Sequence, residues 1–393
     1  MRIALLGHIR HPIAQPFMGG MEAHSWMLAD GLRARGHDVT LFASGDSDPR
    51  FEISPIVDEH YDRTFPWHDF HGTDALNGHL DAAFAATCDR LVRSDFDVVH
   101  NNSLHRFPVR LAQASAVAMV TTLHVPPFIG LARAVRETAV PSSLFTVPST
   151  SQLRAWWPDG APAEAVVVPN GIDIGHWRYS SDHDGGAIWF GRITPNKGTH
   201  LAAAAATIAE MPLTIYGTIE HRDYFETEVR PLLTDRIKYG GHLDGPDLAE
   251  RVRRSAVLLF TPLWDEPFGL AAVEAMACGV PVASLDSGAA REVIGDAGCF
   301  ADSPDAESLA AALRRAMAVP RRIPRARVER LFTLDRMIDR YEELYGQVRR
   351  SIAVRAAHST SGNRAFGGQI SSQAGRSSIS ETSTLLRSVS STL

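Results

Sequence analysis

The sequence predicts an α/β protein with two Rossmann-like domains, each built on a parallel sheet. Apolar, strand-like runs alternate with helical segments through residues 1–169, and the same alternation restarts at Ala187. Between them, residues 175–186 are polar and show no periodicity, so we expect a hinge or linker over residues 170–186. Parallel strands need a crossover connection, usually a helix, so this alternation favours two parallel sheets.

Composition is that of a globular enzyme. The chain has 393 residues, of which 45% are hydrophobic and 21% are charged. The formal net charge of −6 disfavours nucleic acid as a partner. The sequence contains no run of ~18 apolar residues, the length that predicts a membrane-spanning helix. Contact with a membrane surface stays open.

The spacing of the cysteines and the first residues of the chain indicate the cellular compartment of the protein. Cys88, Cys278 and Cys299 are scattered without the spacing of a metal site. Residues 1–12 have too short an apolar stretch for a signal peptide and are expected to begin with a strand. We therefore expect no disulfide framework and a reducing, cytoplasmic location.

The first half opens in the order strand, loop, helix, strand that begins Rossmann-like domains. The expected strands are residues 2–7 and 38–43, and the helix spans residues 22–35. No G-x-G-x-x-G follows the first strand, so this is not the dinucleotide-binding fingerprint. Gly19 and Gly20 open the helix. Two adjacent glycines suit either a tight turn or contact between backbone N–H groups and a phosphate.

Polar residues follow the later strands of the first half. We expect a helix over residues 75–93 and strands at residues 51–57, 97–100, 118–123, 144–147 and 166–168. Asn101 and Asn102 follow one of these strands, and His124 follows the next. Ligands bind beyond the carboxyl ends of parallel strands, so these side chains are candidates for a substrate-facing crevice. Hydrogen bonding within the loops is the alternative for each.

The second half repeats the pattern. We expect helices at residues 199–209, 247–254 and 306–317 and strands at residues 187–190, 213–217, 236–239, 257–260 and 280–283. The loop G-R-I-T-P-N-K-G, residues 191–198, follows the first of these strands and carries Arg192 and Lys197. Two solvated surface cations would give the same pattern. Their position at the carboxyl end of a first parallel strand nevertheless favours an anionic ligand.

One helix in the second half combines anion-binding and acidic features. We expect it to begin with Pro267 in its first turn and to end before Gly279. It is apolar nearly all round except for Glu274, and an unpaired buried carboxylate needs a partner. Glu266 lies at the N-terminus of this helix. The free N–H groups of Phe268, Gly269 and Leu270 would form an anion site there. At about 1.5 Å per residue, Glu274 would lie roughly 12 Å from Glu266.

The stretch from Glu266 to Val282, E-P-F-G-L-x-x-x-E-A-M-A-C-G-x-P-V, resembles the donor-binding signature of the retaining glycosyltransferases of family 4, which have the GT-B fold. Four weaker elements agree in order and spacing. They are Gly19-Gly20, T-x-H-x-P with His124, P-N-G-I-D at residues 169–173, and the loop with Arg192 and Lys197. The family often has Glu where this chain has Asn196. The resemblance covers roughly residues 1 to 350.

The resemblance implies a reaction and a donor site. The reaction is transfer of a hexose from a nucleotide-diphosphate sugar to an acceptor hydroxyl, with retention of anomeric configuration. A UDP-sugar such as UDP-glucose is favoured, with GDP-mannose as the other choice. No metal or other cofactor is expected. The resemblance implies catalytic roles for His124, Arg192, Lys197 and Glu266, and donor binding by Gly19, Gly20, Leu243, Phe268, Gly269, Leu270 and Glu274.

The resemblance also implies that the two halves of the chain bind different substrates. Residues 1–169 would hold the acceptor, with Asn101 and Asn102 as acceptor-side candidates. Residues 187–333 would bind the nucleotide sugar, and a helix at residues 334–350 would cross back onto the first domain. Residues 351–393 are rich in Ser, Gly and Arg with one aromatic residue, which predicts a disordered tail. The acceptor could be a small molecule, a lipid or a glycan.

Three other functions fit parts of the pattern. A glycosidase would use two carboxylates about 5 to 9.5 Å apart, whereas Glu266 and Glu274 are expected roughly 12 Å apart on one helix. A nucleotide-sugar epimerase of similar two-domain shape stays open, and its products would distinguish it. A non-catalytic sugar-nucleotide-binding module would bind the donor without ever releasing a nucleoside diphosphate.

Overall fold

The computed structural model describes residues 1–115, 117–243 and 245–365, with side chains up to residue 352. Residues 1–352 form one compact unit that contains two parallel sheets. The predicted fold class is therefore confirmed: each half of the chain is a Rossmann-like α/β domain. The part of the predicted tail at residues 366–393 lies outside the described residues.

The first sheet has seven parallel strands in the order β3-β2-β1-β4-β5-β6-β7. Its strands are β1 Arg2–Leu6, β2 Asp38–Ser44, β3 Glu52–Val57, β4 Val98–Asn101, β5 Met119–Thr122, β6 Ser143–Val147 and β7 Ala165–Val167. The order reverses between β1 and β4. In doubly wound sheets, a crevice for ligands forms at such a switch point, beyond the carboxyl ends of the strands.

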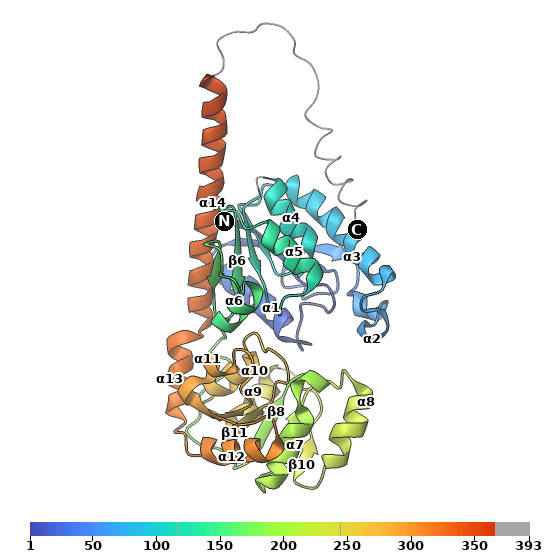
Figure 1. Cartoon of the computed structure of the whole chain (residues 1–393), viewed down its shortest axis with the longest axis vertical. Coiled ribbons are helices and arrows are strands. Elements are labelled where there is room, and N and C mark those ends of the chain that lie inside the picture. Colours follow the sequence, from blue (N-terminus) through green and yellow to red (C-terminus); the bar gives the residue numbers. More distant parts are fainter. Residues whose placement is uncertain (116, 244, 366–393) are drawn as a thin grey trace. The chain divides into compact units, whose positions relative to one another are not determined.

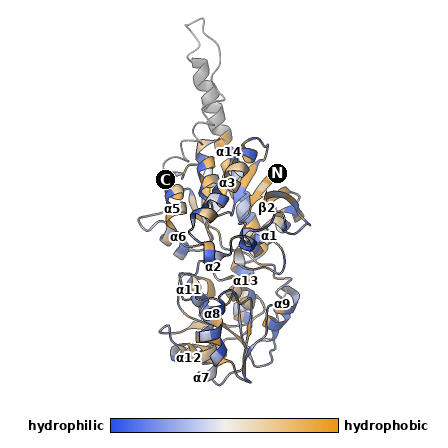
Figure 2. Ribbon diagram, turned by 90° about the vertical axis from the view of Figure 1, so that its right-hand side faces the viewer, coloured by the Kyte–Doolittle hydropathy of each residue, from blue (hydrophilic) through white to orange (hydrophobic). Residues whose placement is uncertain are grey.

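Helices connect these strands. They are α1 Gly20–Ala34, α2 Trp67–Phe70, α3 Asp74–Val92, α4 Arg106–Ala114, α5 Ile129–Glu137 and α6 Thr150–Trp156. Helices α3, α4 and α5 lie next to one another (Figure 1). Thr73 caps α3, because its hydroxyl accepts from the N–H of Leu76. In Figure 2 the hydrophobic colour is concentrated on inner strands such as β2, which is almost wholly buried.

The second sheet has six parallel strands in the order β10-β9-β8-β11-β12-β13. Its strands are β8 Ala187–Phe190, β9 Leu213–Tyr216, β10 Ile237–Tyr239, β11 Val257–Phe260, β12 Val282–Ser284 and β13 Gly298–Phe300. Its helices are α7 Thr199–Ile208, α8 Arg222–Tyr224, α9 Gly245–Arg254, α10 Leu270–Ala277, α11 Ala290–Ile294, α12 Ala306–Ala316 and α13 Arg322–Leu331. Here too the order reverses, between β8 and β11, so each sheet has its own switch point.

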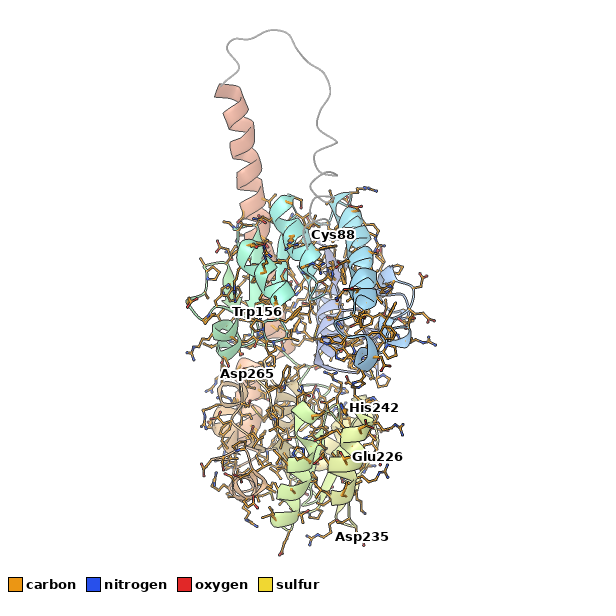
Figure 3. All side chains as sticks on the ribbon, turned by 45° about the vertical axis from the view of Figure 1, so that its right-hand side comes forward. Cys88, Trp156, Glu226, Asp235, His242 and Asp265 are labelled. Atoms are coloured by element: carbon orange, nitrogen blue, oxygen red, sulfur yellow. The ribbon has the colours of Figure 1, made fainter. Side chains whose placement is uncertain are left out.

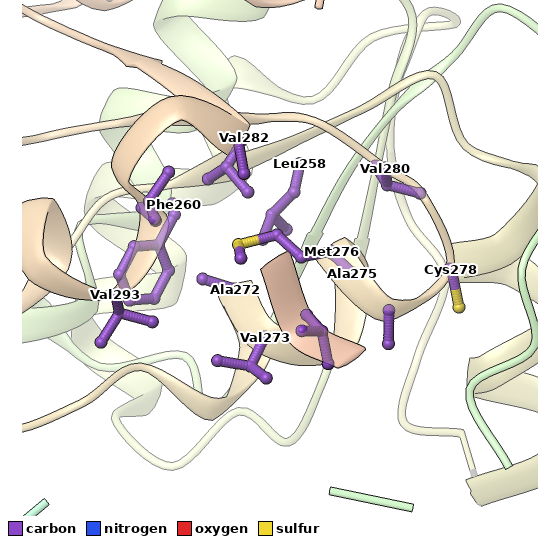
Figure 4. Packing of buried hydrophobic residues seen from close by; sticks show 14 of the residues in the cluster. Leu258, Phe260, Ala272, Val273, Ala275, Met276, Cys278, Val280, Val282 and Val293 are labelled. Carbon is purple, nitrogen blue, oxygen red and sulfur yellow. The ribbon is translucent and has the colours of Figure 1, made fainter. Parts of the chain in front are cut away.

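Helix α10 belongs to the core of the second domain. Figure 4 shows Ala272 and Met276 of this helix in one cluster with Leu258 and Phe260 of β11. Apart from Leu270, Ala271 and Glu274, the side chains of α10 are buried, as expected for a helix that is apolar on nearly all sides. Such packing holds the helix rigidly at the carboxyl ends of the strands, where a binding site needs fixed groups.

Helix α14, Leu334–Ala365, returns to the first domain. Its buried side chains Met337, Ile338, Tyr341 and Tyr345 share a hydrophobic cluster with strand β1. The helix runs past Arg350 to Ala365, so it includes residues 351–365 of the segment for which a disordered tail was predicted. Composition alone did not reveal that these residues continue an already formed helix. Among the described residues, no helix is long and apolar enough to cross a membrane.

Candidate functional site

A cavity of about 500 Å³ lies at the carboxyl ends of strands from both sheets. This volume is within the range of small-molecule sites, which is roughly 300 to 1,000 Å³. The residues predicted as catalytic or donor-binding all line it, namely Gly19, Gly20, His124, Arg192, Lys197, Leu243, Glu266, Phe268, Gly269, Leu270 and Glu274. Segments far apart in the sequence therefore converge on one cavity.

Lys197 and Glu266 form an ion pair in the cavity wall. Lys197 Nζ donates to Glu266 Oε2 over 2.6 Å, and Trp264 Nε1 donates to the same oxygen over 2.8 Å. The ammonium also lies 4.9 Å from the centre of the Trp264 ring, a cation–π distance. Glu266 is buried, so these donors offset the cost of holding its charge away from water. Lysine has three donors, which leaves Lys197 able to bind an anion as well.

Arg192 is held by a second carboxylate, Glu220, which also reaches the first domain. Arg192 Nη1 donates to Glu220 Oε2 over 2.6 Å, and Arg10 Nη2 donates to Glu220 Oε1 over 2.8 Å. Arg10 is fixed in turn by Asp62, through a hydrogen bond of 3.0 Å from its Nε. Although burial opposes it, the attraction of Arg192 and Arg10 holds the pKa of Glu220 below its ordinary value. Glu220 is therefore an anion that orients Arg192 and joins the two domains.

Glu274 has no side-chain partner among the described residues. No side-chain hydrogen bond or ion pair reaches it from the described residues, and its side chain lines the cavity. Burial raises the pKa of this carboxyl to about 7, because nothing compensates the loss of water around its charge. We expected this carboxylate to be paired, and no described residue pairs with it. It is therefore available to a ligand.

Helix α10 begins later than predicted. Its first residue is Leu270, and Gly269 precedes it with a left-handed φ of 92°. A Cβ at this glycine would also lie 2.7 Å from Phe260 Cζ, so both backbone and space require glycine. Pro267 and Phe268 therefore belong to the segment before the helix. Glu266 is not on the helix either, so the separation of roughly 12 Å from Glu274 does not follow from helical rise.

The Gly19-Gly20 loop of the first domain approaches two parts of the second domain. These are the loop that carries Arg192 and the helix α10. A Cβ on Gly19 would lie 3.1 Å from Glu22 Oε2 and 3.6 Å from Arg192 Nε. A Cβ on Gly20 would lie 3.0 Å from Leu270 Cδ1. Neither glycine has a φ that excludes other residues. What both positions need is room, because the backbone passes close to Arg192 and Leu270.

His124 lines the cavity, but Asn101 and Asn102 do not. Both asparagines are buried, and their side chains turn into the first domain. Asn101 Nδ2 donates to Thr121 over 3.3 Å, and its Oδ1 accepts from Ser103. Asn102 Oδ1 lies 3.1 Å from His124 Nε2. The expected acceptor-facing position is therefore corrected for both, because they satisfy their hydrogen bonds inside the fold.

Some residues of this site were not predicted. Glu220 lies a few residues beyond β9, so the rule that selected Asn101 could have selected it. Trp264 precedes Glu266 by two residues and belongs to no pattern that marks a binding site. Arg10 gives no local signal, because its partner Glu220 is 210 residues away. His242 and Tyr216 also line the cavity. Figure 3 labels His242, which follows β10 in the chain. Among the described residues, no group of three or more His, Cys, Asp or Glu side chains could hold a metal ion.

Comparison with known protein families and curated proteins adds independent evidence. The family model of glycosyl transferases group 1 matches residues 182–329, and the model of glycosyltransferase family 4 matches residues 18–176. A phosphatidyl-myo-inositol mannosyltransferase of Mycolicibacterium smegmatis is 28% identical over 319 residues, covering 75% of this chain and 80% of that protein. A glycogen synthase of Mycobacterium tuberculosis is 28% identical over 364 residues, covering 81% of this chain and 87% of that protein.

Solved structures show the same fold. The crystal structure of HepE from Anabaena in complex with UDP-glucose superposes with a TM-score of 0.68 at 18% sequence identity. The match covers 87% of this chain and 98% of that one. At this identity the likeness concerns the fold, which is the GT-B arrangement of two Rossmann-like domains.

Proposed function

The chain belongs to glycosyltransferase family 4, and from this membership and its cavity we infer that it moves a hexose from a nucleotide-diphosphate sugar to an acceptor hydroxyl, with retention of anomeric configuration. The observation that carries the proposal is the meeting of two cations, a free carboxylate and a glycine-rich loop in one cavity. A sugar nucleotide offers a matching set of groups: a diphosphate, a ribose with two hydroxyls, and a sugar.

The diphosphate is the leaving group, and its negative charge rises as the bond to the sugar breaks. Lys197 and Arg192 are fixed in the cavity wall before any ligand arrives, through Glu266 and Glu220. Cations that are already oriented need no reorganisation at the moment of reaction, which is what makes such stabilisation effective. The backbone at Gly269 and Leu270 adds the N–H groups of a helix N-terminus on the same side.

Glu274 and Glu266 take different parts of the donor. Glu274 is an unpaired carboxylate that can accept from both ribose hydroxyls. Glu266 is paired with Lys197 and stabilises positive character at the anomeric carbon or accepts from sugar hydroxyls. His124, on the opposite domain, positions the sugar. No residue in this scheme has to form a covalent bond with the sugar.

We favour a UDP-sugar as the donor, with UDP-glucose as the first to test. HepE, whose fold this chain shares, was solved with UDP-glucose, which supports the choice. A mannosyltransferase among the relatives supports a mannose donor such as GDP-mannose as the alternative. The acceptor could be a small molecule, a lipid or a glycan. The three cysteines are free thiols, consistent with the cytoplasmic location that we expect.

The decisive experiment combines donor binding with transfer. Thermal shift of the full chain against UDP-glucose, other UDP-sugars and GDP-mannose should identify one donor, because a ligand at 100 times its Kd stabilises by about 2.7 kcal/mol. Incubation of that donor with an acceptor panel should then release the nucleoside diphosphate, and NMR of the product should show the donor's anomeric configuration. Donor binding without release across the panel would indicate a binding module, and a changed sugar on the intact nucleotide would indicate an epimerase.

We also propose that transfer needs no divalent metal. Enzymes neutralise a departing diphosphate either with a bound metal ion or with fixed cations, and Lys197 with Arg192 fills that role here. Treatment with EDTA should therefore leave the transfer rate almost unchanged. Loss of transfer on chelation, with recovery on addition of Mn²⁺, would contradict the proposal.

A further inference from the structure

A buried chain of hydrogen bonds leads from the last helix to His124 in the cavity wall. Tyr345 of α14 lies with its hydroxyl 2.6 Å from His100 Nδ1, and His100 Nε2 lies 3.0 Å from Asn102 Oδ1. The same oxygen lies 3.1 Å from His124 Nε2. Tyr345, His100 and Asn102 have no appreciable exposure, so this network is part of the interior rather than the surface.

Asn102 holds both imidazoles through one carbonyl oxygen. Its other side-chain atom, Nδ2, donates to Ser25 Oγ of α1 over 3.2 Å, which directs Oδ1 toward the two histidines. An amide carbonyl oxygen only accepts hydrogen bonds. It follows that His124 carries a hydrogen on Nε2 and donates it to Asn102.

The ring of His124 is neutral and therefore has a single N–H. Burial, with smaller contributions from His24, His100 and His8, holds the pKa of His124 well below its ordinary value. A neutral imidazole with its hydrogen on Nε2 has a free lone pair on Nδ1. No described residue forms a hydrogen bond with His124 Nδ1, and the ring lines the cavity.

A second contact keeps the ring in place. His24 of α1 packs against His124 edge to face, with ring centres 4.4 Å apart, and neither nitrogen of His24 forms a hydrogen bond. His24 thus acts as an apolar wall, while Asn102 supplies the directional contact. Together they leave one orientation in which Nδ1 is presented to the cavity.

We propose that Asn102 is a positioning residue that fixes the tautomer of His124, so that His124 accepts a hydrogen bond from a substrate hydroxyl through Nδ1. The proposal rests on the proposed function for the identity of the ligand, which is a sugar hydroxyl. The tautomer itself is a property of the free protein. Asn102 touches no substrate and acts only through the ring.

The first test reads the tautomer directly. NMR of the full chain labelled with ¹⁵N-histidine, assigned with a His124→Gln variant, should show the ring of His124 with its hydrogen on Nε2 and none on Nδ1. Asn102→Leu removes the accepting oxygen, so the ring should no longer hold one tautomer. A parent protein with the hydrogen on Nδ1 would overturn the proposal, whether or not the protein transfers sugar.

The second test uses transfer. Asn102→Leu should lower kcat/KM by about 10- to 100-fold, the scale of losing one oriented hydrogen bond. Asn102→Asp keeps an accepting oxygen and should recover much of that loss above pH 8. Its negative charge raises the pKa of His124, so its activity divided by that of the parent at the same pH should fall toward pH 6, where the protonated ring has no lone pair.

A matched control separates this effect from damage to the buried network. Thr146→Val removes a buried hydroxyl that bonds Thr122 over 2.8 Å on the neighbouring strand but contacts neither Asn102 nor His124. It should keep the parent's tautomer and kcat/KM. Unchanged kcat/KM in a folded Asn102→Leu protein would overturn the proposal. Absence of transfer by the parent with every donor would instead contradict the proposed function.

Discussion

Lys197 Nζ lies 2.6 Å from Glu266 Oε2 and joins the loop after β8 to the segment that leads into α10. The two residues are 69 positions apart, and both line the cavity. The cation expected to bind the diphosphate is thus oriented by the carboxylate expected beside the sugar. A substitution of either residue should therefore alter the orientation of the other.

Lys197→Ala should lower turnover by about 10²- to 10³-fold, the scale for removing one preorganised donor from a transition state. The loss has two origins, because the variant removes a cation and leaves Glu266 with only Trp264 as a donor. The double variant Lys197→Ala/Glu266→Gln should therefore cost less than the sum of the single variants. Steady-state kinetics with the identified donor measures all three.

Lys238→Ala is the matched control, because Lys238 is the chain's other lysine and is exposed on β10, away from the cavity. It should transfer at the parent rate. Parent-like turnover in the Lys197→Ala protein would exclude the role assigned to Lys197.

Donor affinity should depend on pH through Glu274. The carboxyl has a pKa of about 7 in the free protein, and only its ionised form accepts from both ribose hydroxyls. Donor affinity should therefore fall by up to about tenfold per pH unit below pH 7 and level off above it. In Glu274→Gln the affinity should be weak and flat over this range. Calorimetry between pH 5.5 and 8.5 measures both curves, and a parent curve as flat as that of the variant would argue against the ribose contact.

The same residue should make the free protein less stable at high pH. Its pKa is raised from 4.5 to about 7 on folding, so the folded state holds the proton that the unfolded chain releases. Stability is therefore lost as pH rises from about 4.5 to 7, by about 3 kcal/mol at most. Glu274→Gln should match the parent near pH 4.5 and exceed its melting temperature at pH 8. The exposed Glu307→Gln should show no such gain, and an equal gain there would refute the explanation.

The sequence predicted the sheets and the donor side of the site because both have local signals. Strands such as Val257–Phe260 are short apolar runs. The loop that carries Arg192 and Lys197 and the helix α10 are marked in the sequence by glycines, prolines and charged residues. Side-chain direction at the end of a strand has no such signal. Whether Asn102 faces the cavity or the interior depends on Ser25, His100 and His124, which come from different elements.

Unusual backbone conformations and ion pairs between distant residues could not be predicted from the sequence either. The order Pro-Phe-Gly suits a first helical turn, but Gly269 takes a left-handed conformation and delays the helix to Leu270. Arg10 and Glu220 meet only because the two domains pack against each other. A pattern in one segment cannot reveal a partner in another.

Buried histidines should make the protein sensitive to acid. His24 and His100 are fully buried, and burial lowers the pKa of each to about 3. Below the ordinary value of 6.5 the unfolded chain binds protons that the folded state does not, so stability is lost as pH falls from 6.5 toward 3. Each such histidine can remove about 1.4 kcal/mol per pH unit over that range. Melting temperature should therefore drop steeply between pH 6.5 and 5.

His24 gives the cleanest test, because it is fully buried and makes no hydrogen bonds. His24→Leu should raise the melting temperature at pH 7 and reduce its dependence on pH below 6.5. The exposed His183→Leu should do neither. A pH dependence that is the same in the parent and in His24→Leu would rule out this source of acid sensitivity.

The last prediction concerns the contact between Arg10 and Glu220, which joins the two domains. The side chains are 11% and 12% exposed, so removing one partner leaves a poorly solvated charge on the other. Arg10→Met and Glu220→Gln should each be destabilising, and the double variant should be less destabilised than their sum. We expect a coupling of about 1 to 3 kcal/mol from a double-mutant cycle followed by denaturant unfolding. The exposed pair Arg63 and Glu59, with 59% and 62% exposure, is the matched control and should couple by less than about 1 kcal/mol. If the two cycles gave the same coupling, the contact between the domains would be no stronger than an ordinary surface pair, and Glu220 would act on Arg192 alone.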